Sequence, residues 1–138
     1  MDLSAIIQWQ SLVEEAVAPY NGKIEANDVL AIIWLESRGK SDTVNPHFPA
    51  VGLMGVVARE AGDDFKERPT VEELKDPKTN IEWGIKILAY FLNRSKGSFW
   101  KALYRYSGGS VWANCSDFNQ RYWEPFGAVR AELEERDE

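Results

Sequence analysis

The residues with the clearest chemical potential lie between positions 29 and 55, where Glu36 ends a run of seven apolar residues, Val29 to Leu35. On a helix, Val29, Ile32, Ile33 and Glu36 share one stripe, because their spacing is i, i+3, i+4 and i+7. Burial of an unpaired carboxylate is costly, and the usual outcome is a raised pKa that leaves the group protonated. A protonated carboxyl on a rigid element is what general-acid catalysis needs at neutral pH.

The spacing leaves an alternative open for this glutamate. Helix ends drift by one or two residues in any such interpretation, so Glu36 could instead end the helix facing solvent. Other acids lie nearby in the chain, and we interpret these as solvated surface groups: Asp42, Glu60, Asp63 and Asp64. Glu36 is therefore the one strong candidate for an acid.

Nucleophilic and metal-based chemistry find little support in the remaining residues. Cys115 is the only cysteine, so we expect a buried structural thiol and no intramolecular disulfide. The single histidine, His47, lies in a loop between Pro46 and Phe48, and no sequence feature brings it to Cys115. One histidine cannot build a zinc site without several carboxylates, so we predict no metal and no cofactor.

The elements that would position Glu36 are helical. Cap and stop residues predict a helix at 28–38 that begins at Asn27 or Asp28 and ends at Gly39. Further helices are predicted at 3–17, at 53–61 before Gly62, after the capping box at 70–73, from the Asp76 cap to before Gly97, and from the Ser98 cap to Tyr106. Gly84 inside the longest of them suggests close approach by another helix. The remainder is predicted as one or two helices split at Pro125, with a frayed end at 134–138, and no hairpin is evident, so the fold class is mainly or wholly α.

Four short motifs occur in a characteristic order. They are Glu36-Ser37; Gly52-Leu53-Met54; Asp76-Pro77 with Asn80-Ile81 and Gly84; and Ala102-Leu103 with Tyr106 and Gly109. Together, over residues 25–110, they resemble the catalytic domains of soluble lytic transglycosylases, which cleave peptidoglycan and belong to the lysozyme-like superfamily with goose-type lysozymes. The resemblance implies a mainly α, lysozyme-like single domain over 1–138, with a cleft.

The resemblance also implies roles for particular residues. Glu36 would be the single acid and base, acting on the MurNAc-β-1,4-GlcNAc bond, with the C6 hydroxyl of muramic acid as internal nucleophile and a 1,6-anhydro product. Ser37 would hold the carboxylate or a substrate amide. Gly52, Leu53 and Met54 would form a cleft wall whose backbone meets the N-acetyl groups. Tyr106 would place its hydroxyl near Glu36, and Ser107 would contact substrate.

Three positions depart from the family pattern. Gly55 stands where the family usually has Gln, and Ser107 stands where it usually has Asn. Residues 119–123, Asn-Gln-Arg-Tyr-Trp, only loosely resemble a Glu-Thr-Arg-x-Tyr segment. These positions tune substrate contacts, so subsite geometry and product type depend on them.

Composition narrows the classes of function. The chain has 138 residues and a net charge of −6, which suggests neither disorder nor a nucleic-acid-binding stripe. The first residues lack the basic region and cleavage site of a signal peptide, and no apolar run reaches the roughly 20 residues of a membrane span. We therefore expect a monomer that is made in the cytoplasm and acts on cell-wall peptidoglycan, such as a phage endolysin or virion-associated lysin, or a domain of a longer secreted protein.

Rival functions remain open at this point. A goose-type muramidase would hydrolyse the same bond with water. A catalytically dead peptidoglycan-binding or phage structural domain could keep the fold, and a chitin- or chitosan-cleaving relative is a weaker option. Identification of the products separates the first from a transglycosylase, and loss of turbidity of purified cell walls separates the second.

Overall fold

A computed structural model describes residues 2–45, 48–108 and 111–137. The mainly α fold that the sequence predicts is confirmed, with one small antiparallel hairpin added to it. In chain order the helices and strands are α1 (Ser4–Ile7), α2 (Gln10–Val17), the 3-10 turn Ala18–Tyr20, α3 (Ala26–Ser37), β1 (Ala50–Val51), β2 (Val56–Val57), the 3-10 turns Arg59–Ala61 and Asp63–Phe65, α4 (Val71–Leu74), α5 (Pro77–Arg94), α6 (Phe99–Tyr106), α7 (Cys115–Phe118), a π-helical turn Asn119–Trp123 and α8 (Glu124–Asp137).

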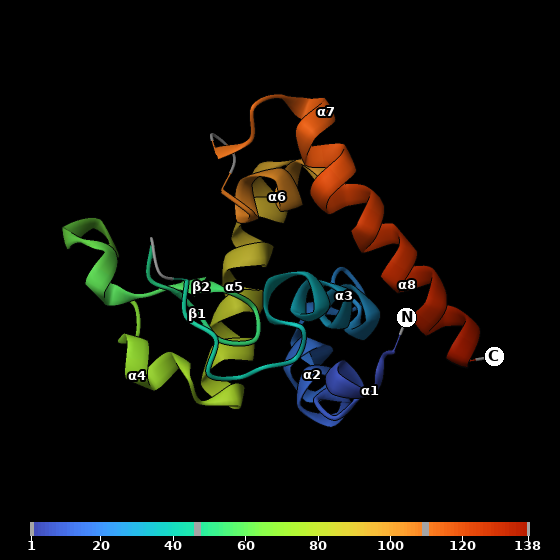
Figure 1. The fold of residues 1–138 in the computed structure, drawn as a ribbon, viewed down its shortest axis with the longest axis horizontal. Coiled ribbons are helices and arrows are strands. Elements are labelled where there is room, and N and C mark those ends of the chain that lie inside the picture. The colour runs from blue at the N-terminus through green and yellow to red at the C-terminus, as the bar shows by residue number, and fades with distance from the viewer. Residues whose placement is uncertain (1, 46–47, 109–110, 138) are drawn as a thin grey trace.

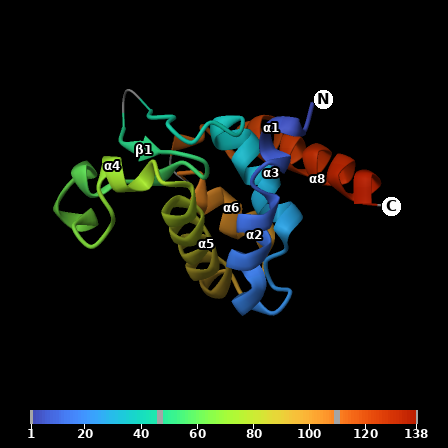
Figure 2. The same ribbon diagram turned by 90° about the horizontal axis from the view of Figure 1, so that it is seen from below.

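Helix α5 runs through the middle of the molecule, with the hairpin and α4 on one side and α2 and α3 on the other (Figures 1 and 2). Helix α3 packs between α2 and α8, and α6 packs on α5. The predicted core side of α5 is confirmed, since Ile81, Ile85, Leu88 and Leu92 are all buried. The long central helix therefore supports both the hairpin and the helices that surround Glu36.

The predicted caps set the beginnings of three helices. Thr70 accepts a hydrogen bond from the Glu73 N–H before α4, and Asp76 accepts one from the Thr79 N–H before α5. Ser98 accepts one from the Lys101 N–H before α6. The three predicted caps are therefore confirmed. Sequence can predict such caps because each acts within one turn of the helix start.

Helix α3 begins two residues earlier than predicted. Its N-cap is Glu25, whose N–H donates to the Asp28 carboxylate at 2.8 Å. The same carboxylate pairs with Arg130 of α8 at 2.8 Å, although Asp28 is almost fully buried. Asp28 therefore caps the start of α3 from the third helical position and also links α3 to α8 through an ion pair.

The predicted helix at 53–61 is wrong. Val51 pairs with Val56 and Ala50 with Val57, and the intervening turn carries Gly52 and Gly55 at φ of 74° and 61°. Such left-handed backbone cannot continue a helix, and glycine adopts it without steric cost. A hairpin with a tight turn therefore replaces the helix, and it brings the turn to the end of α3.

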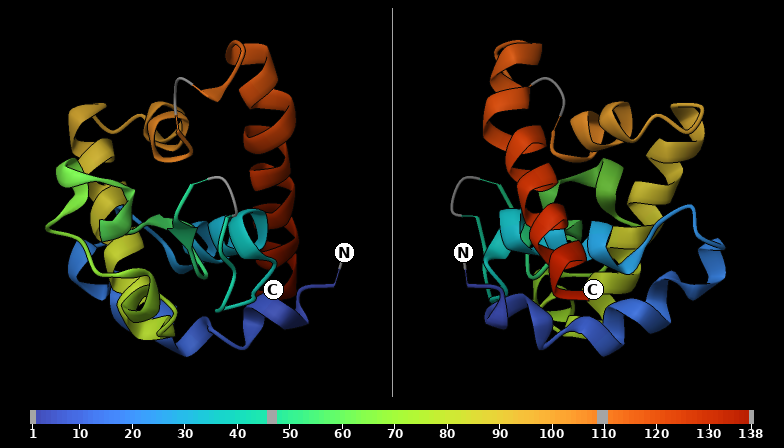
Figure 3. Two further views of the ribbon diagram at one scale, coloured as in Figure 1. Left: turned by 60° about the vertical axis from the view of Figure 1, so that its left-hand side comes forward. Right: turned by 90° about the vertical axis from the view of Figure 1, so that its right-hand side faces the viewer.

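Two other predicted boundaries also differ. The helix predicted at 3–17 is broken at Gln8 and Trp9, where the Trp9 indole N–H donates to the Gly39 carbonyl at 3.0 Å. Pro125 does not split the last helix, which continues from α7 through the π-helical turn into α8 (Figure 3). Proline lacks an N–H, and Pro125 stands just after the π-helical turn as the second residue of α8, where the hydrogen-bonding pattern changes.

No described helix combines the length and the apolar character that a membrane crossing would require.

Candidate active site

Glu36 lies in the last turn of α3, one residue before the helix ends. The stripe predicted from the spacing is confirmed, because Val29, Ile32 and Ile33 are fully buried while Glu36 at its end keeps partial exposure. Arg38 then adopts a left-handed conformation and stops the helix. The carboxyl is thus carried on a rigid, packed element and still reaches a surface hollow.

Different groups face the two oxygens of the Glu36 carboxyl. The Tyr122 hydroxyl donates a hydrogen bond of 2.8 Å to Oε2. On the other side Gly55 packs so closely that an added Cβ would lie 2.5 Å from Oε1. The hydrogen bond orients the carboxyl, and the missing side chain at Gly55 leaves the room that Oε1 occupies.

The environment moves the titration of this carboxyl to neutral pH. Burial raises the pKa of Glu36 to about 7 from 4.5, and the hydrogen bond from Tyr122 offsets part of that rise. The direction predicted from the apolar stripe is therefore confirmed, and removal of the carboxyl from water is its main cause. A group with this pKa can give up and take back a proton at physiological pH.

Two hollows meet at Glu36. We name them the Arg105 hollow, of about 570 Å³, and the Arg121 hollow, of about 480 Å³. Glu36, Ser107 and Val111 line both of them. Among the described lining residues of either hollow, Glu36 is the only carboxylate.

Each hollow has its own set of side chains. The Arg105 hollow is lined by aromatic rings and two arginines: Phe48, Phe65, Phe91, Arg68 and Arg105. The Arg121 hollow is lined by Leu35, Arg38, Trp112, Arg121 and Tyr122. Apolar rings with a few polar groups are typical of sites that bind sugars or other amphipathic ligands.

The structure brings two of the predicted substrate residues into these hollows. Tyr106 lines the Arg105 hollow, and its hydroxyl donates to the Met54 carbonyl at 2.7 Å. Burial and the negative charge of Glu36 raise the pKa of Tyr106 well above its usual value. Ser107 accepts a bond of 2.9 Å from the Trp112 indole and donates to the Leu103 carbonyl at 2.7 Å. Their contact with substrate stays a prediction.

The other four predicted substrate residues lie behind the hollows. Ser37 is buried, and its hydroxyl lies 2.9 Å from the Leu53 carbonyl and 3.1 Å from the Ile33 carbonyl, while it accepts from Gly39. Leu53 and Met54 are fully buried. Backbone groups of the turn are engaged within the protein, since Gly52 N–H donates to the Thr43 carbonyl and Met54 N–H to Asn80. These residues shape the turn that supports Glu36, and their contact with sugar stays a prediction.

Tyr122 is the residue that sequence analysis did not assign. It lies 86 positions from Glu36 in the sequence, and the π-helical turn Asn119–Trp123 presents it to the carboxyl. The only signal was the loose resemblance of residues 119–123 to a family segment that ends in tyrosine. Neither local spacing nor apolar periodicity links two residues so distant in sequence.

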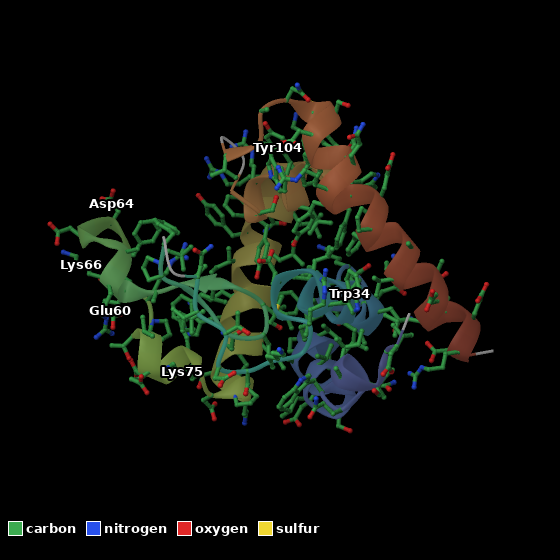
Figure 4. The ribbon with its side chains drawn as sticks, in the orientation of Figure 1. Trp34, Glu60, Asp64, Lys66, Lys75 and Tyr104 are labelled. Carbon is green, nitrogen blue, oxygen red and sulfur yellow. The ribbon has the colours of Figure 1, made fainter. Side chains whose placement is uncertain are left out.

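Among the described residues, none of the other acids named from the sequence lines either hollow, and neither does Cys115. Figure 4 shows Glu60 and Asp64 on the lobe far from Trp34 of α3, and Glu60 accepts a bond from the Val71 N–H at 3.0 Å. Cys115 is exposed at the start of α7, so its prediction as a buried thiol is wrong, because the short helix presents that position to solvent. His47 and Gly109 lie outside the described residues. Within 2–45, 48–108 and 111–137, no group of three His, Cys, Asp or Glu side chains is arranged to hold a metal.

Comparison with known proteins identifies the family of the chain. The profile of the family described as "Transglycosylase SLT domain" matches residues 12–124. Among curated proteins, the "Endo-type membrane-bound lytic murein transglycosylase A" of Salmonella paratyphi B, Salmonella enteritidis and Salmonella typhimurium is 33% identical over 93 residues. The match covers 63% of this chain and 44% of each relative. The chain therefore corresponds to less than half of the length of these relatives.

Proposed function

The chain belongs to the transglycosylase SLT domain family, and we propose that it cleaves the β-1,4 bond between MurNAc and GlcNAc in peptidoglycan, with Glu36 as the only acid and base. The observation that carries this proposal is the Glu36 carboxyl, whose pKa is raised to about 7 and which opens to two hollows with no second carboxylate among their described lining residues. A glycan strand can extend from the scissile bond into both hollows.

The first step uses the protonated carboxyl. Glu36 donates its proton to the glycosidic oxygen while the bond from that oxygen to C1 of the muramic residue breaks, and positive charge builds at C1. The sugar that leaves takes the proton as a new hydroxyl. The Tyr122 hydrogen bond supports this step, because it favours the carboxylate that forms.

The second step returns the proton to Glu36. The C6 hydroxyl of the same muramic residue attacks C1, and its proton moves to the Glu36 carboxylate, which closes a 1,6-anhydro ring. Hydrolysis usually takes a second carboxylate about 5–9.5 Å from the acid, as nucleophile or as base for water. The absence of such a group from the described lining residues favours the internal hydroxyl, which also benefits from proximity.

A binding domain without catalysis is the contrasting possibility. A partly buried carboxyl destabilises a scaffold relative to an apolar residue of similar size, so its presence beside Tyr122 favours catalysis.

Turbidity of purified cell walls tests the proposal directly. We expect the parent protein to clear the walls and Glu36→Gln to lose about 100-fold or more of the rate, because general acid–base catalysis contributes that much. Asp42→Asn, which removes an exposed carboxylate elsewhere, is the matched control and should keep the parent rate. Clearing by Glu36→Gln at the parent rate would reject the assignment.

The cellular role stays a prediction. We propose that the protein acts as a monomeric lysin of the phage type on the wall. Such a lysin should lyse cells whose outer layer has been permeabilised. Sedimentation of the purified protein should give the mass of one chain. Wall clearing without lysis of cells would favour a role in wall turnover instead.

A further inference from the structure

The charges around Glu36 differ in sign from those of the chain as a whole. The sequence has 22 acidic against 16 basic residues, a net charge of −6. Yet four arginines line the two hollows, and Glu36 is the only acid among the described lining residues. Positive charge concentrated in a hollow with apolar walls attracts anionic groups more strongly than the same charge on an open surface.

Arg38 is held at the rim of the Arg121 hollow. Its guanidinium lies over the Trp34 ring at 3.5 Å from the centroid, and one of its nitrogens donates to the Trp34 carbonyl. Its backbone has a φ of 56°, in the left-handed region where glycine or asparagine is favoured and arginine is uncommon. The sequence therefore keeps a long cationic side chain at a position where the backbone alone would favour a small residue.

Arg121 also lines this hollow, and it lies on the π-helical turn that carries Tyr122. Its guanidinium lies 5.6 Å from the centroid of the Trp112 ring, and one nitrogen pairs with Asp117 at 3.4 Å. The side chain is 70% exposed, so this ion pair leaves its other N–H groups accessible. Both arginines can therefore donate to a ligand in the hollow, since a guanidinium carries five N–H donors.

We propose that the Arg121 hollow is a carboxylate-binding subsite, in which Arg38 and Arg121 recognise a carboxylate carried by the glycan on that side of the scissile bond. The inference rests on the proposed function, because it assumes that the glycan is peptidoglycan. Planar guanidinium groups bind carboxylates through paired, charge-assisted hydrogen bonds. The apolar body of the sugar would rest against Leu35 and Trp112.

This subsite distinguishes glycans by charge. Muramic acid carries a lactyl ether whose carboxylate is free in peptide-free strands, and stem peptides carry carboxylates of their own. Chitin has the same β-1,4-linked backbone of N-acetylated sugars without any carboxylate. Arg38 and Arg121 would thus be specificity-determining residues that favour peptidoglycan over chitin.

Binding to the Glu36→Gln variant, in which substrate is not consumed, tests the subsite. Isothermal titration calorimetry would use three tetrasaccharide probes. The first is chitotetraose, the second is the peptide-free tetrasaccharide of two GlcNAc–MurNAc units with free lactyl carboxylates, and the third is the same tetrasaccharide with stem peptides. Arg38→Gln and Arg121→Gln would each be added to this background. Arg94→Gln is the matched control, because Arg94 lies on α5 over the Tyr90 ring and lines neither hollow.

We expect Arg38→Gln and Arg121→Gln each to bind at least one carboxylate-bearing probe about tenfold more weakly than the Glu36→Gln background does, as the loss of a charge-assisted hydrogen bond predicts. Chitotetraose should bind both variants and the control alike. The charged probe that loses affinity identifies the source of the carboxylate, lactyl or stem. Added salt should weaken the charged probe selectively.

Equal affinity of both variants and the control for the charged probes would overturn the subsite, as would an equal loss for chitotetraose. Failure of the Glu36→Gln protein to bind any charged probe better than chitotetraose would also overturn it. Each of these outcomes leaves the proposed function intact, because that depends on wall clearing by the parent protein. Melting temperatures of the variants confirm that they are folded.

Discussion

As the proposed acid and base, Glu36 would meet two conflicting demands. Catalysis needs a carboxyl with a high pKa, and stability favours an apolar residue at the same place. Burial raises its pKa from 4.5 to about 7. A carboxyl with a raised pKa binds its proton more tightly in the folded protein, so its ionisation destabilises the fold. The destabilisation is absent below pH 4.5, grows as pH rises toward 7 and is complete above it.

The Glu36→Gln variant should therefore be more stable than the parent at alkaline pH. Each unit of pKa shift corresponds to about 1.4 kcal/mol, so the gap should approach about 3 kcal/mol above pH 7 and close toward pH 4. Thermal unfolding at several pH values measures it. Glu82→Gln, at an exposed site, is the matched control. A Gln variant no more stable than the parent at pH 8 would contradict the raised pKa.

Tyr122 tunes the same group in the opposite direction. Its hydroxyl donates to Glu36 and lowers the pKa of that carboxyl, so Tyr122→Phe should move the alkaline limb of the kcat/KM profile to higher pH. The value of kcat should fall as well, because the carboxyl loses the donor that orients it. Tyr104→Phe, in the same aromatic cluster but without a bond to Glu36, should leave the limb in place. An alkaline limb that stays or moves to lower pH in Tyr122→Phe would argue against this pairing.

At the scale of elements, the hairpin turn is fixed to α5 by one buried amide. Asn80 accepts from the Met54 N–H at 2.8 Å and donates to the Val51 carbonyl at 2.7 Å and the Leu74 carbonyl at 2.9 Å. Asn80→Ala removes the side-chain partner of all three buried backbone groups, which should cost about 3 kcal/mol of unfolding free energy. Urea unfolding followed by circular dichroism measures this. Asn93→Ala, exposed on the same helix, should change stability little, and equal effects of the two would contradict the anchor.

Close approach at Gly84 is the second link between these elements. The sequence suggested another helix as the neighbour, but the neighbour is Met54 of the turn, whose Cβ would lie 2.8 Å from an added Cβ. Gly84→Ala should therefore destabilise by about 1–3 kcal/mol through overpacking. Gly127→Ala in α8 meets nothing within 4 Å and should stabilise by about 0.5–1 kcal/mol. The same sign for both substitutions in urea unfolding would contradict the packing.

The elements that sequence predicted well are those with local signals. The helices after Thr70, Asp76 and Ser98 begin where predicted, because a cap acts within one turn of its own residue. The hairpin was missed because short apolar segments such as 51–57 fit a helix or a strand equally well, and the choice depended on the left-handed Gly52 and Gly55. Continuity across Pro125 depended on a π turn that no pattern indicated.

At the scale of the whole molecule, the site is assembled from segments distant in sequence. Glu36 comes from α3, the Gly55 wall from the hairpin turn and Tyr122 from the segment that leads into α8. The apolar stripe and the family motifs, which are both readable from sequence, made Glu36 the candidate acid. Its tyrosine partner was not assigned, because that contact depends on how the segment leading into α8 packs on α3. The two hollows likewise appear only once the chain is folded.

We propose that one glutamate of this protein cleaves peptidoglycan with an internal hydroxyl as nucleophile. Mass spectrometry of muropeptides released from purified peptidoglycan tests it most directly, with the parent and the Glu36→Gln variant compared in fresh digests. We expect the parent to release muropeptides with anhydro ends, one water lighter than the reducing-end products of a hydrolase, and the variant to release almost none. Reducing ends alone from the parent would contradict the internal nucleophile, and equal release by the variant would contradict the role of Glu36.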